Sequence, residues 1–342
     1  MRIGVLTSGG DCPGLNAVIR GLVLKGTTAH DLEFVGVRDG WRGLIEADHV
    51  PLGRHEVKGL SKVGGTILGT SRTHPYDTAG GGPENLQRQL SRAGIDGVVA
   101  IGGEGTLAGA NRLAADGLPV VGVPKTIDND LGATDYSFGF DTAVNIATDA
   151  MDRLRTTGDS HRRVMVAEVM GRDVGWIALH SGLASGAHVI LLPEVPLHPE
   201  EVCEHVRSAH DRGRAPLVVV SEGFTFAGGS QVHQATGSDP SGRPRLGGIG
   251  EVVAAAIAAG TGLEVRTTVL GYIQRGGAPS AFDRVLATRL GLHAADLVAE
   301  QGWGQMVALR GTEIVRVPMA EAVGALNTVP RHRYDEAAAL FG

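Results

Sequence analysis

The chain has 342 residues, of which 42% are hydrophobic and 20% are charged. This composition is typical of a folded globular protein and excludes a disordered one. The length exceeds the size at which a single core usually stops growing, so two domains are expected. The formal net charge of −6 excludes a basic nucleic-acid-binding surface, so any phosphorylated ligand must be bound by locally placed Arg and Lys.

Glycine and cysteine usage narrow the class further. The 52 glycines are about twice the usual share of roughly 7%, and they follow expected strands, which indicates loop chemistry. Cys12 and Cys203 are far apart in the chain, which fits a reducing compartment without disulfides. No apolar run approaches the roughly 18 residues that a membrane helix needs, and no leader precedes the strand-like residues 2–6. We expect a soluble cytoplasmic protein with no membrane partner.

The first strand, at 2–6, runs into a glycine turn at 7–14 and a helix that starts at Leu15. The turn resembles a dinucleotide loop but lacks the G-x-G-x-x-G spacing. A strand, a glycine turn and a helix start still suit a bound phosphate, so Gly10 is a candidate phosphate-binding residue.

A second strand at 32–37 and a small-residue loop at 64–73 follow. The loop contains a lone Arg72, which is either a surface charge or, beside a triphosphate, a clamp on the leaving group. The alternation of strands and helices up to this point predicts a doubly wound parallel sheet.

Two strand-and-loop units come next, and they organise the chain. The strands at 97–101 and 119–123 are short continuous apolar runs, which suits central parallel strands buried on both faces. Their loops, at 102–106 and 124–130, contain small or charged residues. Because ligands of open parallel sheets bind beyond the carboxyl ends of the strands, the two loops are predicted to line one site.

The first of these loops suits phosphate and a metal ion. Gly102, Gly103 and Gly105 let the backbone approach a ligand and turn its N–H groups toward an anion. Thr106 opens a helix whose amino end adds its dipole to the same anion. Glu104 fits beside an anion once Mg²⁺ is included, because this ion prefers one or two carboxylates together with phosphate oxygens.

The second loop supplies a cation and two carboxylates. Asp128 and Asp130 are two residues apart, so in an extended segment both side chains face the same side. One of them can accept a proton while the other steadies the metal or the loop. The alternative for either loop alone is an ordinary turn in which glycines serve conformation and aspartates serve as caps. The two loops together favour a site.

The strand and helix pattern restarts after Asp141, the expected N-cap of a long helix. Further strands are expected at 164–169, 188–192, 217–220, 264–270, 306–309 and 314–317. Further helices are expected at 174–183, 199–212, 249–259 and 280–301. The polar segment 224–248 is interpreted as a surface loop, and the tail after Asn327 gives no signal.

A second phosphate-binding set follows the strand at 264–270. Arg266 and Arg275 lie at this strand and its loop with a glycine pair at 276–277, which suits a phosphate on a different substrate. Two phosphate-binding sets in two sheets imply two phosphorylated ligands that meet in a cleft between domains. That is the geometry of phosphoryl transfer, where catalysis is largely positioning and charge neutralisation.

Together these motifs resemble the 6-phosphofructokinase family, in the same order and over nearly the whole chain. The resemblance rests on residues 7–11 with 13–16, the loop 102–106, and residues 126–130, 169–172 and 268–277. It implies an α/β phosphofructokinase fold of two similar doubly wound Rossmann-like domains with a cleft between them. Residues 1–138 with 250–303 would form the donor domain, and residues 139–249 with 304–342 the fructose 6-phosphate domain.

By this resemblance Asp128 is the general base that takes the proton from the 1-hydroxyl of fructose 6-phosphate. The sugar phosphate would be bound by Thr126, Asp128, Asp130, Arg163, Met170, Gly171, Arg172, Glu222, Arg266, Tyr272 and Arg275. The donor would be bound by Gly10, Arg72, Thr73, Gly102, Gly103, Glu104, Gly105, Thr106 and Lys125. Glu104 would be the Mg²⁺ ligand. In the family, the positions of Arg163 and Arg266 reach in from a neighbouring subunit, which implies a homodimer or homotetramer.

Some positions depart from the best-known bacterial pattern of the family. Glu104 stands where Asp is usual, and Tyr272 stands where a His often contacts the sugar phosphate; its hydroxyl could substitute. Gly105 and Lys125 point to different donors. Gly105 leaves room for a nucleotide, whereas a Lys at position 125 is typical of the pyrophosphate-dependent branch. A side chain at position 105 could exclude ATP, whereas an extra cation at position 125 need not. We therefore expect ATP as the donor, with pyrophosphate as the alternative.

Two rivals of other classes explain only part of the sequence. An NAD-kinase-like enzyme would carry a loop similar to 102–106, but it would not explain residues 170–172 or 266–277. A non-enzymatic sugar-phosphate sensor would not need Asp128 and Glu104 placed around a metal.

Overall fold

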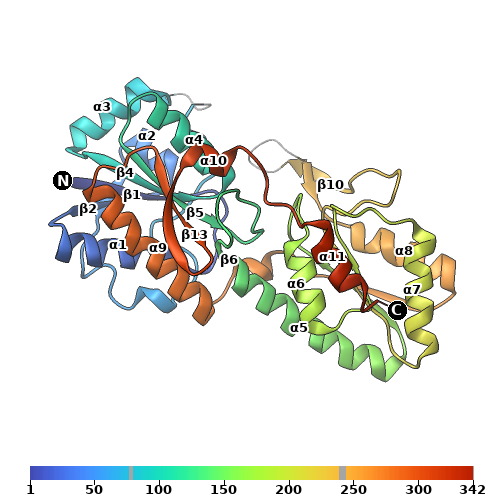
Figure 1. The fold of residues 1–342 in the computed structure, drawn as a ribbon. Coiled ribbons are helices and arrows are strands. Elements are labelled where there is room, and N and C mark those ends of the chain that lie inside the picture. The colour runs from blue at the N-terminus through green and yellow to red at the C-terminus, as the bar shows by residue number, and fades with distance from the viewer. Residues whose placement is uncertain (77–79, 239–243, 342) are drawn as a thin grey trace. The chain divides into compact units, whose positions relative to one another are not determined.

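The computed structural model describes residues 1–76, 80–238 and 244–341. The chain divides into two compact units, and several segments of the sequence contribute to each (Figure 1). Unit 1 comprises Met1–Ile127, Leu131–Asp141 and Arg275–Leu326. Unit 2 comprises Asp128–Asp130, Thr142–Gln274 and Asn327–Gly342.

The observed division differs from the expected domain boundaries. Residues 250–274 belong to unit 2, because helix α8 (Ile249–Thr261) packs against the second sheet. Residues 304–326 belong to unit 1, because strand β13 (Gln305–Arg310) pairs with β5 (Val120–Thr126) in the first sheet. The short segment Asp128–Asp130 clusters with unit 2, although it follows β5 directly in the chain.

The sheet of unit 1 has eight strands in the order β14-β13-β5-β4-β1-β2-β3, with β6 paired to β5. The remaining strands are β1 (Arg2–Ser8), β2 (Glu33–Val37), β3 (His49–Pro51), β4 (Gly97–Gly102), β6 (Phe138–Gly139) and β14 (Glu313–Pro318). The central strands are parallel and buried, as expected. Both edges are antiparallel. The β14 edge has this direction because only a short turn separates β13 from β14, and a parallel pair needs a long crossover.

The helices of unit 1 are α1 (Leu15–Ala29), α2 (Trp41–Glu46), α3 (Pro83–Ala93), α4 (Glu104–Ala115), α9 (Ala281–Ala299) and α10 (Met319–Val323). Helix α9 lies along α1 (Figure 1). Two glycines allow this close approach: a Cβ on Gly291 would lie 2.3 Å from the carbonyl oxygen of Val18, and one on Gly21 would lie 2.7 Å from that of Thr288. The Nζ atom of Lys25 bonds Asp296 at 2.6 Å and so also ties α1 to α9.

The sheet of unit 2 is fully parallel, in the order β12-β7-β9-β8. Its strands are β7 (Val164–Val169), β8 (Val189–Leu191), β9 (Leu217–Ser221) and β12 (Val265–Val269). The associated helices are α5 (Phe140–His161), α6 (Trp176–Ser185), α7 (Pro199–Asp211), α8 and α11 (Arg331–Ala338). Glu168 is buried in β7, and its carboxylate accepts hydrogen bonds from the N–H groups of Gly248 and Gly250, which fixes the start of α8.

The expected surface loop at 224–248 is corrected in part. It contains the antiparallel pair β10 (His233–Ser238) and β11 (Pro244–Leu246), while residues 239–243 lie outside the described residues. The pair has few apolar residues, so no alternation in the sequence could indicate it. None of the helices in the described parts of the chain is long and apolar enough to cross a bilayer.

Candidate active site

The turn after β1 is held by a second segment of unit 1. Gly9 has a φ of 85°, in the left-handed region that favours glycine. Its N–H donates to the carbonyl of Ser71 at 2.9 Å, and the Thr70 hydroxyl donates to the Gly9 carbonyl at 2.6 Å. These bonds bring residues 72 and 73, both expected to bind the donor, close to the turn that contains Gly10.

Two cations lie beside Gly10. Lys125 is only 5% exposed, and its Nζ donates to the Gly10 carbonyl. A guanidinium nitrogen of Arg275, Nη1, donates to the Asp11 carbonyl at 3.4 Å and would lie 2.9 Å from a Cβ on Gly10. The Nε of Arg275 is buried and has no hydrogen-bond partner among the described residues. Arg275 was expected at the sugar phosphate; in the structure it lies beside the turn of unit 1 that is expected to bind the donor.

The pKa of the Cys12 thiol is shifted by burial and by the same two cations. Burial raises the pKa of Cys12 to about 12; Lys125 and Arg275 oppose this rise, and Asp283 and Asp11 add to it. The thiol therefore stays protonated at neutral pH and supplies no nucleophile.

Helix α4 begins at Glu104, two residues earlier than expected, with Gly103 as its N-cap. Glu104 and Gly105 therefore occupy the first turn, where backbone N–H groups are available to an anion. Thr106 is buried inside that turn, and a Cβ on Gly102 would lie 2.3 Å from the Cβ of Thr106, so glycine is required there. A Cβ on Gly105 would meet nothing within 4 Å.

The metal ligands available here suit an ion that is bound partly by the protein and partly by phosphate oxygens of the substrate. Within the described residues, no group of three or more His, Cys, Asp or Glu side chains is arranged to hold a metal. Glu104 offers one carboxylate at the helix start that suits phosphate. That combination matches Mg²⁺, which is usually bound by one or two carboxylates and by phosphate oxygens.

The segment that contains the expected general base is a tight turn of unit 2. Asn129 has a φ of 55° and is buried. The turn is therefore not extended, and the expectation that Asp128 and Asp130 share a side through strand alternation is wrong. Asn327 binds this turn twice: its side-chain Nδ2 donates to the Asn129 carbonyl at 2.9 Å, and its N–H donates to the Asp130 carbonyl at 2.9 Å.

The loops after β7 and β9 bring together four of the expected sugar-binding residues of unit 2, namely Met170, Gly171, Arg172 and Glu222. Gly171 and Arg172 both have positive φ, 147° and 52°, so the backbone turns sharply after Met170. The N–H of Arg172 donates to a carboxylate oxygen of Glu222 at 3.1 Å. A Cβ on Gly223 would lie 1.8 Å from the Arg172 carbonyl oxygen, so only glycine permits this contact between the ends of β7 and β9.

Arg163 and Arg266 lie elsewhere in the same unit. Both bind Glu264, with 2.8 Å between Arg163 Nε and Glu264 Oε2, and the Arg163 hydrogen bond lowers the pKa of Glu264. They sit where β7 and β12 begin, whereas loop 170–172 follows the end of β7. A strand of this length spans roughly 20 Å. Within one chain, the two arginines are therefore not brought to the sugar-binding loop.

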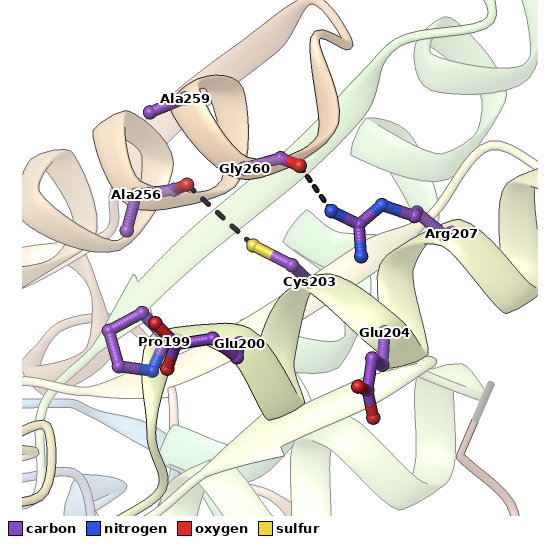
Figure 2. Close-up of a pocket in the computed structure, with 8 residues that line it drawn as sticks. All are labelled: Pro199, Glu200, Cys203, Glu204, Arg207, Ala256, Ala259 and Gly260. Atoms are coloured by element: carbon purple, nitrogen blue, oxygen red, sulfur yellow. Dashed lines mark hydrogen bonds between the residues drawn. The ribbon is translucent and has the colours of Figure 1, made fainter.

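A cavity of about 530 Å³ lies between α7 and α8 (Figure 2). None of the expected site residues lines it. Its thiol, Cys203, donates to the Ala256 carbonyl at 3.7 Å, and Arg207 donates to the Gly260 carbonyl. Figure 2 shows both groups directed at the α8 backbone, so they do not converge on a ligand.

Comparison with known proteins assigns the family. The sequence model described as phosphofructokinase matches residues 2–298, which is most of the chain. The chain belongs to the phosphofructokinase family. A pyrophosphate–fructose 6-phosphate 1-phosphotransferase of Amycolatopsis methanolica is 58% identical over 342 residues, and an ATP-dependent 6-phosphofructokinase of Mycobacterium bovis is 51% identical over 344 residues. Each alignment covers 100% of both chains.

The fold comparison agrees. A crystal structure of a pyrophosphate-dependent phosphofructokinase from Nitrosospira multiformis matches with a TM-score of 0.84 at 22% identity, over 96% of this chain and 86% of that chain. The resemblance and the two-domain α/β phosphofructokinase fold are confirmed. The family match and the named relatives support phosphofructokinase activity over the NAD-kinase-like and sensor rivals. Relatives named for either donor match, so the family leaves the donor open.

Four residues that contact the expected site residues or their loops were not identified from the sequence. Gln274 is fully buried and accepts from the Met170 N–H at 3.4 Å, and only its position between Tyr272 and Arg275 could have indicated it. The others, Glu264, Asn327 and Trp176, are defined by tertiary contacts alone.

Proposed function

We propose that this phosphofructokinase transfers a phosphoryl group from pyrophosphate to the 1-hydroxyl of fructose 6-phosphate, giving fructose 1,6-bisphosphate and phosphate. The choice of pyrophosphate rests on Lys125. This side chain is buried, and its Nζ donates a hydrogen bond to the carbonyl of Gly10, in the turn expected to bind the phosphoryl donor. Pyrophosphate has no nucleoside, so its binding and the charge of its leaving group both depend on cations at its phosphates. Lys125 and Arg275 supply two such cations.

The named relatives support pyrophosphate as the first candidate donor and ATP as the second. This reverses the expectation from the sequence, which was ATP. Three relatives at 56% to 58% identity are named for pyrophosphate, and the ATP-dependent relatives are 50% to 51% identical. ATP is the second candidate, and one observation favours it: Gly105 is exposed, and the space beside it is open for a nucleotide.

In the proposed reaction Asp128 takes the proton of the 1-hydroxyl as that oxygen attacks phosphorus and the bridging P–O bond breaks. Arg72, Thr73 and the glycines of the two donor turns would orient the donor. Glu104 would hold Mg²⁺ together with phosphate oxygens, and the ion would neutralise phosphate charge. Thr126, Asp130, Glu222 and loop 170–172 would orient the sugar. The cleft in which these two sets meet stays a prediction.

We further propose that the active form is a homodimer or homotetramer. Arg163 and Arg266 would bind the 6-phosphate of a sugar held by a neighbouring subunit. Their position at the far end of β7 from loop 170–172 supports this role, because within one chain they do not join that loop. Tyr272, which is 73% exposed, would contact the sugar phosphate through its hydroxyl.

The donor is tested by the rate of fructose 1,6-bisphosphate formation with pyrophosphate or ATP at equal concentration, with Mg²⁺. We expect turnover with pyrophosphate, and Lys125→Met should lower it by about 10²–10³. The exposed Lys58→Met is the matched control and should keep wild-type rates. Turnover with ATP alone would reverse the donor choice, and turnover with neither would overturn the proposed activity.

A further inference from the structure

The turn Asp128–Asp130 contains a residue with a strained backbone conformation. Asn129 adopts the left-handed conformation, which costs free energy for any residue with a Cβ, although Asn tolerates it better than most. Such a conformation persists where the surrounding structure holds it in place. Contacts from outside the turn to the carbonyl groups of Asn129 and Asp130 would therefore help to stabilise it.

Asn327 supplies those contacts from the far end of the sequence. Its side-chain Nδ2 donates to the Asn129 carbonyl, and its own N–H donates to the Asp130 carbonyl, both at 2.9 Å. One residue thus binds two consecutive carbonyls and fixes the position and the direction of the turn. Two hydrogen bonds from one half-buried residue restrain the turn more than either bond alone would.

Asn327 is itself anchored to the helix that follows the sugar-binding loop. The indole Nε1 of Trp176, the first residue of α6, donates to the Asn327 carbonyl at 2.6 Å. Two residues further along the tail, the N–H of Val329 donates to Glu194 at 2.9 Å, and the same carboxylate oxygen accepts from Gly175 at 3.0 Å. The tail is therefore tied at two points to the start of α6, four residues beyond Arg172.

We propose that Asn327 is a positioning residue for phosphoryl transfer. It fixes the turn that carries Asp128 against the segment that carries loop 170–172, with Trp176 as its anchor. It touches main-chain carbonyls and not the substrate, so it acts through the turn. The inference rests on the proposed role of Asp128, because a general base must lie within hydrogen-bond reach of the hydroxyl it deprotonates.

The test compares Asn327→Ala, Asn327→Asp and Trp176→Phe in the full-length chain. Each removes a donor, and Trp176→Phe keeps the aromatic ring, so one variant retains the packing. We expect kcat to fall by about 10 to 100-fold, because small misplacements of a reacting group cost that much. The KM for fructose 6-phosphate should stay within about threefold, since the loss falls on the transition state.

Two comparisons distinguish a loss of positioning at the turn from a general loss of folded structure. Asn327→Asp keeps the size of the side chain and loses its N–H donors, so it should be as slow as Asn327→Ala; wild-type kcat in Asn327→Asp overturns the proposal. Asn85→Ala is the matched control, because Asn85 also donates a side-chain amide to a main-chain carbonyl, that of Gly80 close to the start of α3 in unit 1. Its kcat should be unchanged.

Amide hydrogen exchange of the turn gives a readout that needs no substrate. Exchange at residues 129–131 should be faster in Asn327→Ala and in Trp176→Phe than in the wild type. Unchanged exchange overturns the positioning role whatever the activity. A wild-type chain inactive toward fructose 6-phosphate overturns the proposed function, whereas faster exchange in the variants would still support the restraint on the turn.

Discussion

Asp128 is the side chain on which the proposed chemistry depends, because deprotonation of the sugar hydroxyl needs an acceptor at the reacting oxygen. Asp128→Ser removes that acceptor and keeps a small polar side chain. We expect kcat to fall by roughly 10²–10⁴ while fructose 6-phosphate still binds, as when a general base is lost. Steady-state kinetics together with calorimetric titration of the sugar phosphate measure the two effects separately.

A matched control tests whether the loss of any one carboxylate would lower turnover. Asp152 is exposed on α5, so Asp152→Ser makes the same chemical change away from the turn and should leave kcat and binding unchanged. Equal turnover of Asp128→Ser and wild type would remove Asp128 from the role of base.

Residue types identified part of the site in advance, and tertiary contacts determine the rest. Gly102, Gly171 and Lys125 stand out because core packing alone seldom requires a glycine at or near the end of a strand or a cation within an apolar run. Asn327 lies in a tail without periodicity, and its partners are carbonyl groups almost two hundred residues earlier in the chain. No local pattern reports such a contact, so neither Asn327 nor the left-handed Asn129 could be predicted.

At the scale of elements, the α1 and α9 pair shows how glycine sets the distance between helices. Gly291 has a helical backbone, so alanine would normally stabilise the helix there. Its Cβ would lie 2.3 Å from the Val18 carbonyl oxygen, a main-chain atom that a side-chain rotation cannot move. Gly291→Ala should therefore lower the free energy of unfolding by about 1–3 kcal/mol, the usual cost of overpacking.

Chemical denaturation monitored by circular dichroism measures this change. Thr28→Ala on the exposed side of α1 is the control and should stay within about 0.5 kcal/mol of wild type. An unfolding free energy of Gly291→Ala equal to or above the wild-type value would show that α1 and α9 can separate at low cost.

Strong apolar patterns made the long elements predictable, whereas the ends of these elements and the short elements could not be predicted. The buried runs at 97–101 and 164–169 became β4 and β7 because continuous Val and Ile favour a central strand. The start of α4 was misplaced because Glu104 is compatible with either a loop or a first helical turn. Helix α11 is mostly polar and strand β3 has only three residues, so neither shows a clear apolar period.

At the scale of the whole molecule, the position of two arginines bears on the assembly. Arg163 and Arg266 share Glu264 at the beginning of β7 and β12, while Met170 and Glu222 follow the ends of β7 and β9. In a parallel sheet these two ends are separated by the full length of the strands. A site that uses both sets must therefore combine two copies of the chain, and closed two-fold symmetry is the commonest arrangement.

Mixing two inactive variants tests this arrangement. Asp128→Ser lacks the base and Arg266→Ala lacks one 6-phosphate contact, so each homo-oligomer should be slow. If Arg266 acts on the neighbouring subunit, a mixed dimer has one site with both defects and one site with neither. Random mixing should then restore about a quarter of the wild-type activity.

The amount restored distinguishes the two geometries. If Arg266 served the site of its own chain, every site in the mixture would keep one defect, and the activity would be only the average of the two variants. The measurement is the initial rate after the two proteins are unfolded together and refolded, with each variant refolded alone as the control. Complementation above that average would place the completion of the site at the interface between subunits, and its absence would restrict each site to one chain.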